Sequence, residues 1–253
     1  MTKDNIYVSN KLKEFIDEIQ YHNRNPIDNS VLKMLEDIDT NPERIISPGG
    51  KFLYRSRVIH AKDKLQKKYP FFGFDEKGSF VPPPDCTRDM RANYRYIPYL
   101  YCATSPYLSI VEVRPRLGAK VSVARIKAKE ELRLFDFSMQ NRPKKMNNTK
   151  ENLLGALSQL YSKPVTEDDD TLDYIQTQYI AEFVKEKKYD GIVFRSSQYY
   201  DEDNVNVVIF NYNKCEVTGS VVYKVEQNSY RCSMQDSSAA WLNMPPILRE
   251  TSI

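Results

Sequence analysis

The sequence has few of the residues that build metal centres or histidine-based active sites. It holds two histidines, His22 and His60, and four cysteines, with no CxxC pair among them. A zinc site needs several such ligands at characteristic short spacings, and none can be assembled here. A Ser-His-Asp triad would need one of the two histidines, and neither lies in a recognisable local context. We therefore expect no metal site and no serine-hydrolase site.

The phosphate-binding and catalytic glycine motifs are also missing. The sequence contains no GxxxxGK[ST], no GxGxxG and no GxSxG. No apolar run approaches the length of a membrane span. The polar start MTKDN lacks the apolar segment of a signal peptide. We expect a cytoplasmic protein with reduced thiols that does not bind a membrane.

The overall charge is close to neutral, with 37 basic and 34 acidic residues. Such a balance does not support direct binding to nucleic acid. The longest basic run, residues 62–68, is interpreted as a solvated helix face. The chain is rich in tyrosine, with 18 against one tryptophan, which suits half-buried binding faces and equally a β-rich core.

The length of 253 residues fits one large domain with short additions. Apolar residues at helical spacing predict two helices, over residues 11–25 and 29–39. The segment ISPGG at 46–50 ends this helical pattern. We predict an N-terminal helical extension over 1–48, a main domain over 49–228 and a C-terminal tail over 229–253.

The main domain is predicted to be α+β, because its strands come in blocks and do not alternate strictly with helices. A helix should begin at Ser105 as N-cap and Pro106 as first residue, continue through Glu112 and end near Pro115. Further helices are expected over 149–162 and 171–187. Strands are expected over 51–60, 98–103, 121–126, 133–137, 192–195, 205–211 and 217–225.

Two arginines lie in the strand FLYRSRV. Alternation places Arg55 and Arg57 on one face, opposite Tyr54 and Ser56. Two guanidinium groups on one face can bind a pyrophosphate. The residues alone equally fit an edge strand with solvated arginines.

Other polar residues interrupt apolar segments. Glu112 lies in LSIVEVRP, where it is either solvated on an amphipathic helix or held in a site. Ser196 and Ser197 end the strand GIVFRSS, where a hydroxyl can bind a ligand or stabilise a turn. The local pattern does not choose between these alternatives.

The sequence resembles the RES domain family, whose members include toxins of bacterial toxin–antitoxin pairs. The resemblance covers roughly residues 50–225 and lies in four blocks. These are LYRSR at 53–57, MRANYRYIPYLYCATSPYLSIVEVRP at 90–115, YDGIVFRSSQ at 189–198 and NVVIF at 206–210.

The resemblance implies a set of site residues. Arg55, Tyr101 and Glu112 match family positions. Arg91 matches a second family arginine, although Met90 replaces the glycine that usually precedes it, so Arg95 stays an alternative. Ser196 matches the family serine, with Ser197 as the alternative. The implied fold is similar to that of ADP-ribosyltransferase toxins, with a split, mostly antiparallel sheet surrounded by helices.

The resemblance also implies an activity on NAD⁺ as substrate, with no separate cofactor. Family members degrade NAD⁺ by hydrolysis or phosphorolysis, and some ADP-ribosylate a protein. In the implied roles, Glu112 stabilises positive charge on the ribose, Arg55 and Arg91 hold phosphates, and Tyr101 or Tyr54 stacks on a ring. Ser196 binds the substrate or fixes the glutamate.

Candidate partners are an antitoxin that blocks the site and a second copy of the chain. The N-terminal extension is a candidate to replace or modify the antitoxin contact. A non-catalytic module that binds NAD⁺ or ADP-ribose stays open, as does a toxin that acts on RNA.

Overall fold

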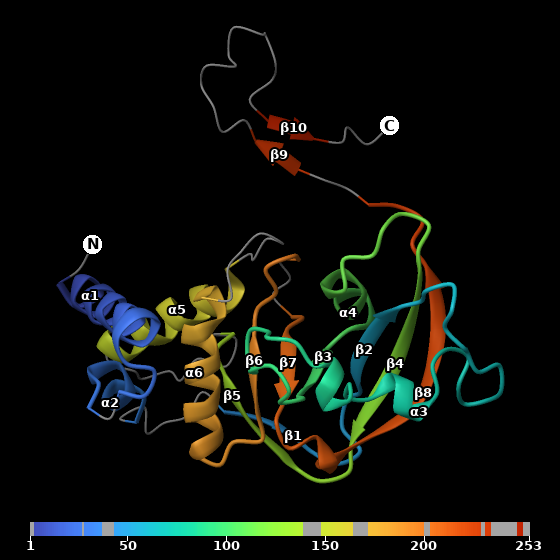
Figure 1. The fold of residues 1–253 in the computed structure, drawn as a ribbon, viewed down its shortest axis with the longest axis horizontal. Coiled ribbons are helices and arrows are strands. Elements are labelled where there is room, and N and C mark those ends of the chain that lie inside the picture. The colour runs from blue at the N-terminus through green and yellow to red at the C-terminus, as the bar shows by residue number, and fades with distance from the viewer. Residues whose placement is uncertain are drawn as a thin grey trace, which may run out of the picture.

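The protein is an α+β domain built on one large sheet, as shown by the computed structural model in Figure 1. The structure describes residues 3–26, 28–36, 43–138, 148–163, 172–199, 203–228, 231–233 and 247–249. Helices cluster beside one half of the sheet, at the left of Figure 1. The predicted class, a mostly antiparallel sheet with surrounding helices, is confirmed.

The sheet has eight strands in the order β1-β5-β6-β7-β3-β2-β4-β8. Among the described strands of this sheet, β5 and β6 pair in parallel and the other neighbours pair antiparallel. The strands are β1 (Glu43–Ile46), β2 (Leu53–Val58), β3 (Leu100–Ala103), β4 (Lys120–Ala128), β5 (Leu132–Asp136), β6 (Gly191–Phe194), β7 (Asn206–Ile209) and β8 (Cys215–Lys224).

The sheet is split between β2 and β3. These strands meet at a single residue pair, Tyr54 with Ala103. By contrast, β2 pairs with β4 along all of its length, and β3 pairs likewise with β7. The sheet therefore consists of two well-paired halves that are joined at one point. The first half is β1-β5-β6-β7-β3 and the second half is β2-β4-β8. This is the split that the family resemblance implied.

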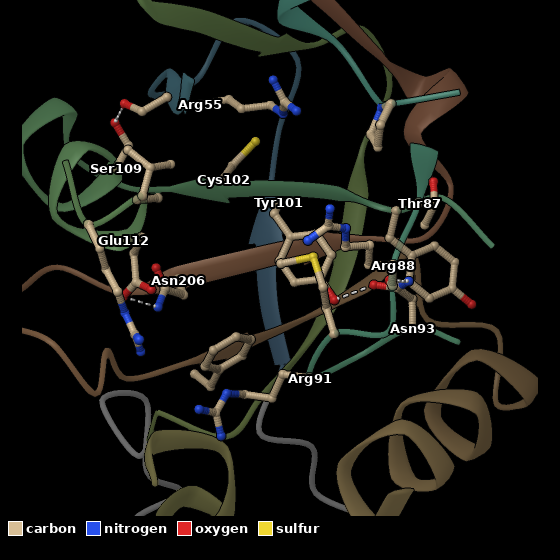
Figure 2. A pocket seen from close by; sticks show the side chains of 18 of the residues that line it. Arg55, Thr87, Arg88, Arg91, Asn93, Tyr101, Cys102, Ser109, Glu112 and Asn206 are labelled. Carbon is tan, nitrogen blue, oxygen red and sulfur yellow. Dashed lines mark hydrogen bonds between the residues drawn. The ribbon is translucent and has the colours of Figure 1, made fainter. Parts of the chain in front are cut away.

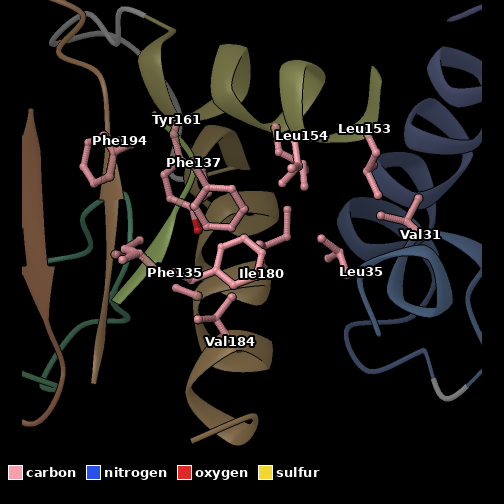
Figure 3. Close-up of a cluster of buried hydrophobic side chains, with 14 of the residues drawn as sticks. Val31, Leu35, Phe135, Phe137, Leu153, Leu154, Tyr161, Ile180, Val184 and Phe194 are labelled. Atoms are coloured by element: carbon pink, nitrogen blue, oxygen red, sulfur yellow. The ribbon is translucent and has the colours of Figure 1, made fainter. Parts of the chain in front are cut away.

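One face of the first half is covered by four helices, α1 (Lys3–Asp17), α2 (Ser30–Glu36), α5 (Asn148–Ser162) and α6 (Leu172–Glu186). A π-helical turn at Glu18–His22 follows α1. Figure 3 shows how this core is layered, with Phe135 and Phe194 of the sheet on one side and Val31 and Leu35 of α2 on the other. The N-terminal helices thus share a continuous hydrophobic core with the sheet.

The other face of the sheet carries a second core. Leu100, Val193 and Ile209 face it, while Val208 and Ile192 face the helices, as alternation along a strand requires. Segments around Phe71 and Phe80 cover this second core. Short helices complete the fold: α3 (Glu76–Ser79), α4 (Pro106–Glu112), and 3-10 turns at Pro84–Cys86 and Tyr212–Lys214.

Two parts of the fold differ from expectation. The end of the predicted helical extension forms β1, which is held by an ion pair between Arg44 and the buried Asp136, with Nη2 to Oδ2 at 2.9 Å. The basic run 62–68 is not a helix face, so that interpretation was wrong. It forms irregular chain, in which Lys68 pairs with Phe71, and Phe71 in turn pairs with Ser220 of β8.

Within the predicted tail, β9 (Arg231–Ser233) and β10 (Ile247–Arg249) pair with each other. Other parts of the tail from residue 234 lie outside the described residues. In the described part of the chain, no helix is both long and apolar enough to span a membrane.

Gly191 should be required for the sheet to pair. A Cβ added there would lie 2.2 Å from the Val208 carbonyl oxygen and 2.9 Å from the Leu134 side chain, so strands must move apart. We expect Gly191→Ala to lower the free energy of unfolding by about 1–3 kcal/mol in urea titrations.

In α5, Gly155 has no atom within 4 Å of such a Cβ. Gly155→Ala should therefore raise stability by about 0.5–1 kcal/mol, and equal effects of the two variants would contradict this packing.

Candidate functional site

A cavity of about 730 Å³ lies where the sheet splits. Its lining comes from β2, β3, β6, β7, α4 and residues 82–93, with Tyr161 of α5 and Tyr174 of α6. In Figure 2, Arg55 and Cys102 lie on one side of β3, and Tyr101, Glu112 and Arg91 lie on the other. The cavity therefore reaches both faces of the sheet through the gap between its two halves.

Glu112 reaches the cavity because α4 begins where the sequence predicts and ends three residues before the predicted end near Pro115. The Ser105 hydroxyl accepts a hydrogen bond from the Leu108 amide at 3.2 Å, and Pro106 is the first helical residue. The helix ends at Glu112. This places the carboxylate at the helix C-terminus, on the cavity wall.

The Glu112 carboxylate is fixed by two side chains that lie where β6 ends and β7 begins. Ser196 Oγ donates a hydrogen bond to Glu112 Oε1 at 2.5 Å, and Asn206 Nδ2 donates to the same oxygen at 2.7 Å. Oε2 makes no hydrogen bond to any described residue. Ser196 Oγ also accepts from the amides of Gln198 and Tyr199, each at 3.0 Å. The predicted Glu112–Ser196 pair is therefore in direct contact, and Ser197 lines the cavity beside it.

Asn206 is a member of this cluster that the sequence interpretation missed. It opens strand β7 and lies opposite Ala103 and Phe194 in the register of the sheet. In the sequence Asn206 is an amide residue at the start of the apolar run NVVIF, and in the structure it is buried. A polar side chain in that position needs a partner, and here the partner is Glu112.

Arg55 and Arg57 share one strand face, as alternation predicted. Both reach toward α3, with Arg55 Nη1 3.4 Å from the Ser79 carbonyl and Arg57 Nη1 3.4 Å from that of Gly78. Arg55 lines the cavity, and burial lowers its pKa, partly offset by the nearby Cys102 thiol. Among the described contacts it makes none with Glu112 or Ser196.

Arg57 lies outside the cavity lining. Its guanidinium is 4.2 Å from the centre of the Phe74 ring and 3.8 Å from an oxygen of Asp63. Two arginines side by side on β2 therefore do not face the cavity together. Tyr54, on the opposite face of β2, does line it.

A buried hydroxyl pair joins β2 to α4. The Oγ atoms of Ser56 and Ser109 are 2.7 Å apart, and both residues line the cavity. Figure 2 shows Ser109 at this wall of the cavity. Ser109 also donates to the Pro106 carbonyl at 2.7 Å, which leaves Ser56 as the donor in the pair. This contact ties the second half of the sheet to the helix that carries Glu112, and no local sequence pattern predicts it.

The segment 88–95 presents its arginines differently. Arg91 lines the cavity, and burial lowers its pKa. Its guanidinium donates to the carbonyls of Leu160 at 3.0 Å and Lys163 at 2.6 Å, at the end of α5. Arg95 lies over the Tyr96 ring at 5.0 Å, outside the lining, whereas Arg88 lines the cavity from an exposed position.

Tyr101 binds this segment with its hydroxyl and lines the cavity with its side chain. The hydroxyl donates to Asn93 Oδ1 at 2.7 Å and accepts from the Ala92 amide at 3.1 Å. Burial raises the pKa of the phenol. The hydroxyl is thus occupied in holding the chain at 92–93, and the ring is what faces the cavity.

The described residues contain no group of three or more His, Cys, Asp and Glu side chains placed to hold a metal ion. Cys86, Cys102 and Cys215 are free thiols, and burial raises the pKa of Cys215 to about 11. The cavity is lined by carboxylate, guanidinium, amide and hydroxyl groups and by the thiols of Cys86 and Cys102.

Tyr101→Phe should loosen the chain at residues 92–93. The change leaves the Ala92 amide and the Asn93 side chain buried with one hydrogen bond fewer each, which costs about 1–3 kcal/mol. We expect the Ala92 amide to exchange with solvent at least about tenfold faster. Tyr107, which is 60% exposed, provides the control in Tyr107→Phe. Unchanged exchange at Ala92 would show that the hydroxyl does not hold this segment.

Comparison with known proteins places the chain in a family. A chain of the M. tuberculosis MbcT–MbcA toxin–antitoxin complex is similar in structure at 12% identity and a TM-score of 0.44, with 78% of this chain and 94% of that chain covered. No curated protein matches significantly. The family model of the RES domain matches residues 53–233, which include strands β2 to β8 and the residues that line the cavity. The protein belongs to the RES domain family.

Proposed function

We propose that the protein cleaves the bond between nicotinamide and ribose in NAD⁺. Membership of the RES family supports this proposal, because NAD⁺ is the substrate that the family resemblance implies. The observation that carries it is the fixed Glu112 carboxylate, with one oxygen held by Ser196 and Asn206 on the wall of a cavity. The cavity volume of about 730 Å³ lies in the range of sites for small ligands.

The chemistry suits a carboxylate without a partner acid. Cleavage of a glycosidic bond passes through a transition state that resembles an oxocarbenium ion. Nicotinamide leaves NAD⁺ as a neutral molecule, so it needs no proton. Glu112 stabilises the positive charge that develops on the ribose, and the C-terminal end of α4 adds negative potential at the same place. Ser196 and Asn206 fix the carboxylate so that little reorganisation is needed during the reaction.

The arginines around the cavity supply a site for the phosphates of the dinucleotide. Arg91 and Arg88 lie on residues 88–91, and Arg55 approaches from the opposite face of the sheet. Guanidinium groups bind phosphate oxygens with paired hydrogen bonds. The rings of Tyr54 and Tyr101 offer flat apolar faces for stacking. In this arrangement Arg91 binds the phosphates and Ser196 holds the glutamate. Substrate binding depends less on Arg57, Arg95 and Ser197.

The acceptor of the ADP-ribosyl group is water or phosphate in the primary proposal, which makes the protein a toxin that depletes cytoplasmic NAD⁺. A protein acceptor is the second candidate, and binding without turnover is the third. By the family resemblance, an antitoxin that covers the cavity is the proposed partner. Product analysis separates the three acceptors, as free ADP-ribose, ADP-ribose 1″-phosphate or labelled protein.

Glu112→Gln keeps the shape of the side chain and removes its charge. We expect it to lower the rate of NAD⁺ consumption by at least about 100-fold, because the developing positive charge loses its counter-charge. Nicotinamide release followed by proton NMR measures the rate. Glu226→Gln, at an exposed position beyond β8, should match the wild type. A wild-type rate for Glu112→Gln would exclude this mechanism, and no turnover by concentrated wild-type protein would favour the binding module.

A further inference from the structure

Helix α6 holds the arginine-bearing segment of the cavity through one buried side chain. Gln178 is 2% exposed. Its amide nitrogen donates to the carbonyls of Asn93 at 2.8 Å and Met90 at 3.0 Å. It also lies 3.4 Å from Asp89 Oδ1. A buried amide with its donors directed at one loop fixes that loop, because its hydrogen bonds cannot be exchanged for water.

Helix α5 holds the same segment from a second direction. The carbonyls of Leu160 and Lys163 at its C-terminal end accept hydrogen bonds from the Arg91 guanidinium. A cation at a helix C-terminus is stabilised by the helix dipole. The position of Arg91 in the cavity therefore depends on where α5 ends.

Both helices are in turn positioned by residues N-terminal to the RES match, which begins at residue 53. Gln20 Nε2 donates to the Leu172 carbonyl at 2.9 Å and to Gln176 Oε1 at 3.0 Å, at the start of α6. The Tyr179 hydroxyl donates to the Pro26 carbonyl at 3.2 Å, and its ring packs against Phe15.

Apolar packing between α2 and α5 completes the contact, with Leu35 and Val31 facing Leu153 in Figure 3. The chain of contacts therefore runs from the N-terminal helices, through α5 and α6, to residues 89–93. Each link is a direct hydrogen bond or a side-chain contact.

We propose that Gln178 is a positioning residue, and that α1 and α2 brace the arginine segment 88–93 through it and thereby set the affinity of the cavity for its substrate. The inference rests on the proposed function, in which Arg88 and Arg91 bind phosphates. It gives the N-terminal extension a role in substrate binding. Preorganised side chains bind more tightly because less freedom is lost on binding.

The brace is separate from the cluster that performs the chemistry. The partners of Glu112 are Ser196, at the end of β6, and Asn206 of β7, and neither hydrogen bond passes through α5 or α6. Weakening the brace should therefore impair binding of the dinucleotide far more than bond cleavage. We therefore expect KM to rise while kcat stays nearly unchanged, a result that a general loss of stability would not produce.

The test compares Gln178→Leu, Gln20→Leu and the control Gln159→Leu in the full chain. Gln159 lies on the exposed face of α5 and makes no side-chain hydrogen bond to a described residue. We measure kcat and KM for NAD⁺, together with amide exchange at residues 89–93 and, for reference, in β8. Gln20→Leu is the milder variant, should Gln178→Leu not fold.

We expect Gln178→Leu to raise KM at least about tenfold with kcat within about twofold, and to speed exchange at 89–93 while β8 stays unchanged. Gln20→Leu should raise KM about threefold, and Gln159→Leu should match the wild type. An unchanged KM in both variants, or equally faster exchange in β8, would overturn the proposal. If wild-type protein leaves NAD⁺ intact, the proposed function fails, and exchange at 89–93 alone then decides whether the brace exists.

Discussion

The single pairing of Tyr54 with Ala103 is the constraint on which the site depends. Because β2 and β3 meet only there, the sheet leaves a gap that a fully paired sheet would close. The chain leaves β3 at Ala103 and enters α4 shortly afterwards, so the same point also fixes where Glu112 lies. The Ser56–Ser109 contact then ties α4 back to the other half of the sheet. The existence of the cavity and the position of the Glu112 carboxylate thus both follow from the break in hydrogen bonding between β2 and β3.

The two sides of the cavity have different tasks in this account. One side orients Glu112 through Ser196 and Asn206, where the ends of β6 and β7 converge. The other side carries Arg88 and Arg91 on a segment held by Tyr101, Gln178 and α5. Separate supports allow binding and bond cleavage to be altered independently. Helices α1 and α2, which lie outside the family match, pack closely against the RES domain.

Local patterns in the sequence predicted the elements but not the contacts between them. Alternation and helical spacing located the main strands and helices, and Ser105 with Pro106 marked the start of α4. The short strand β1 was missed because it is held by the distant Asp136, which local propensity does not report. Asn206 and Gln178 were missed for the same reason. Each is an ordinary amide whose role exists only once its partner, about 90 residues away in sequence, is brought beside it.

In the proposed complex, NAD⁺ binds across the split with its nicotinamide ribose against residue 112. The most direct test is a crystal structure of the Glu112→Gln variant with NAD⁺, in which slow turnover preserves the substrate. We expect the ribose beside the substituted side chain and Oγ of Ser196, with the phosphates toward Arg88 and Arg91. A dinucleotide bound outside the cavity, or bound with its ribose remote from residue 112, would contradict it.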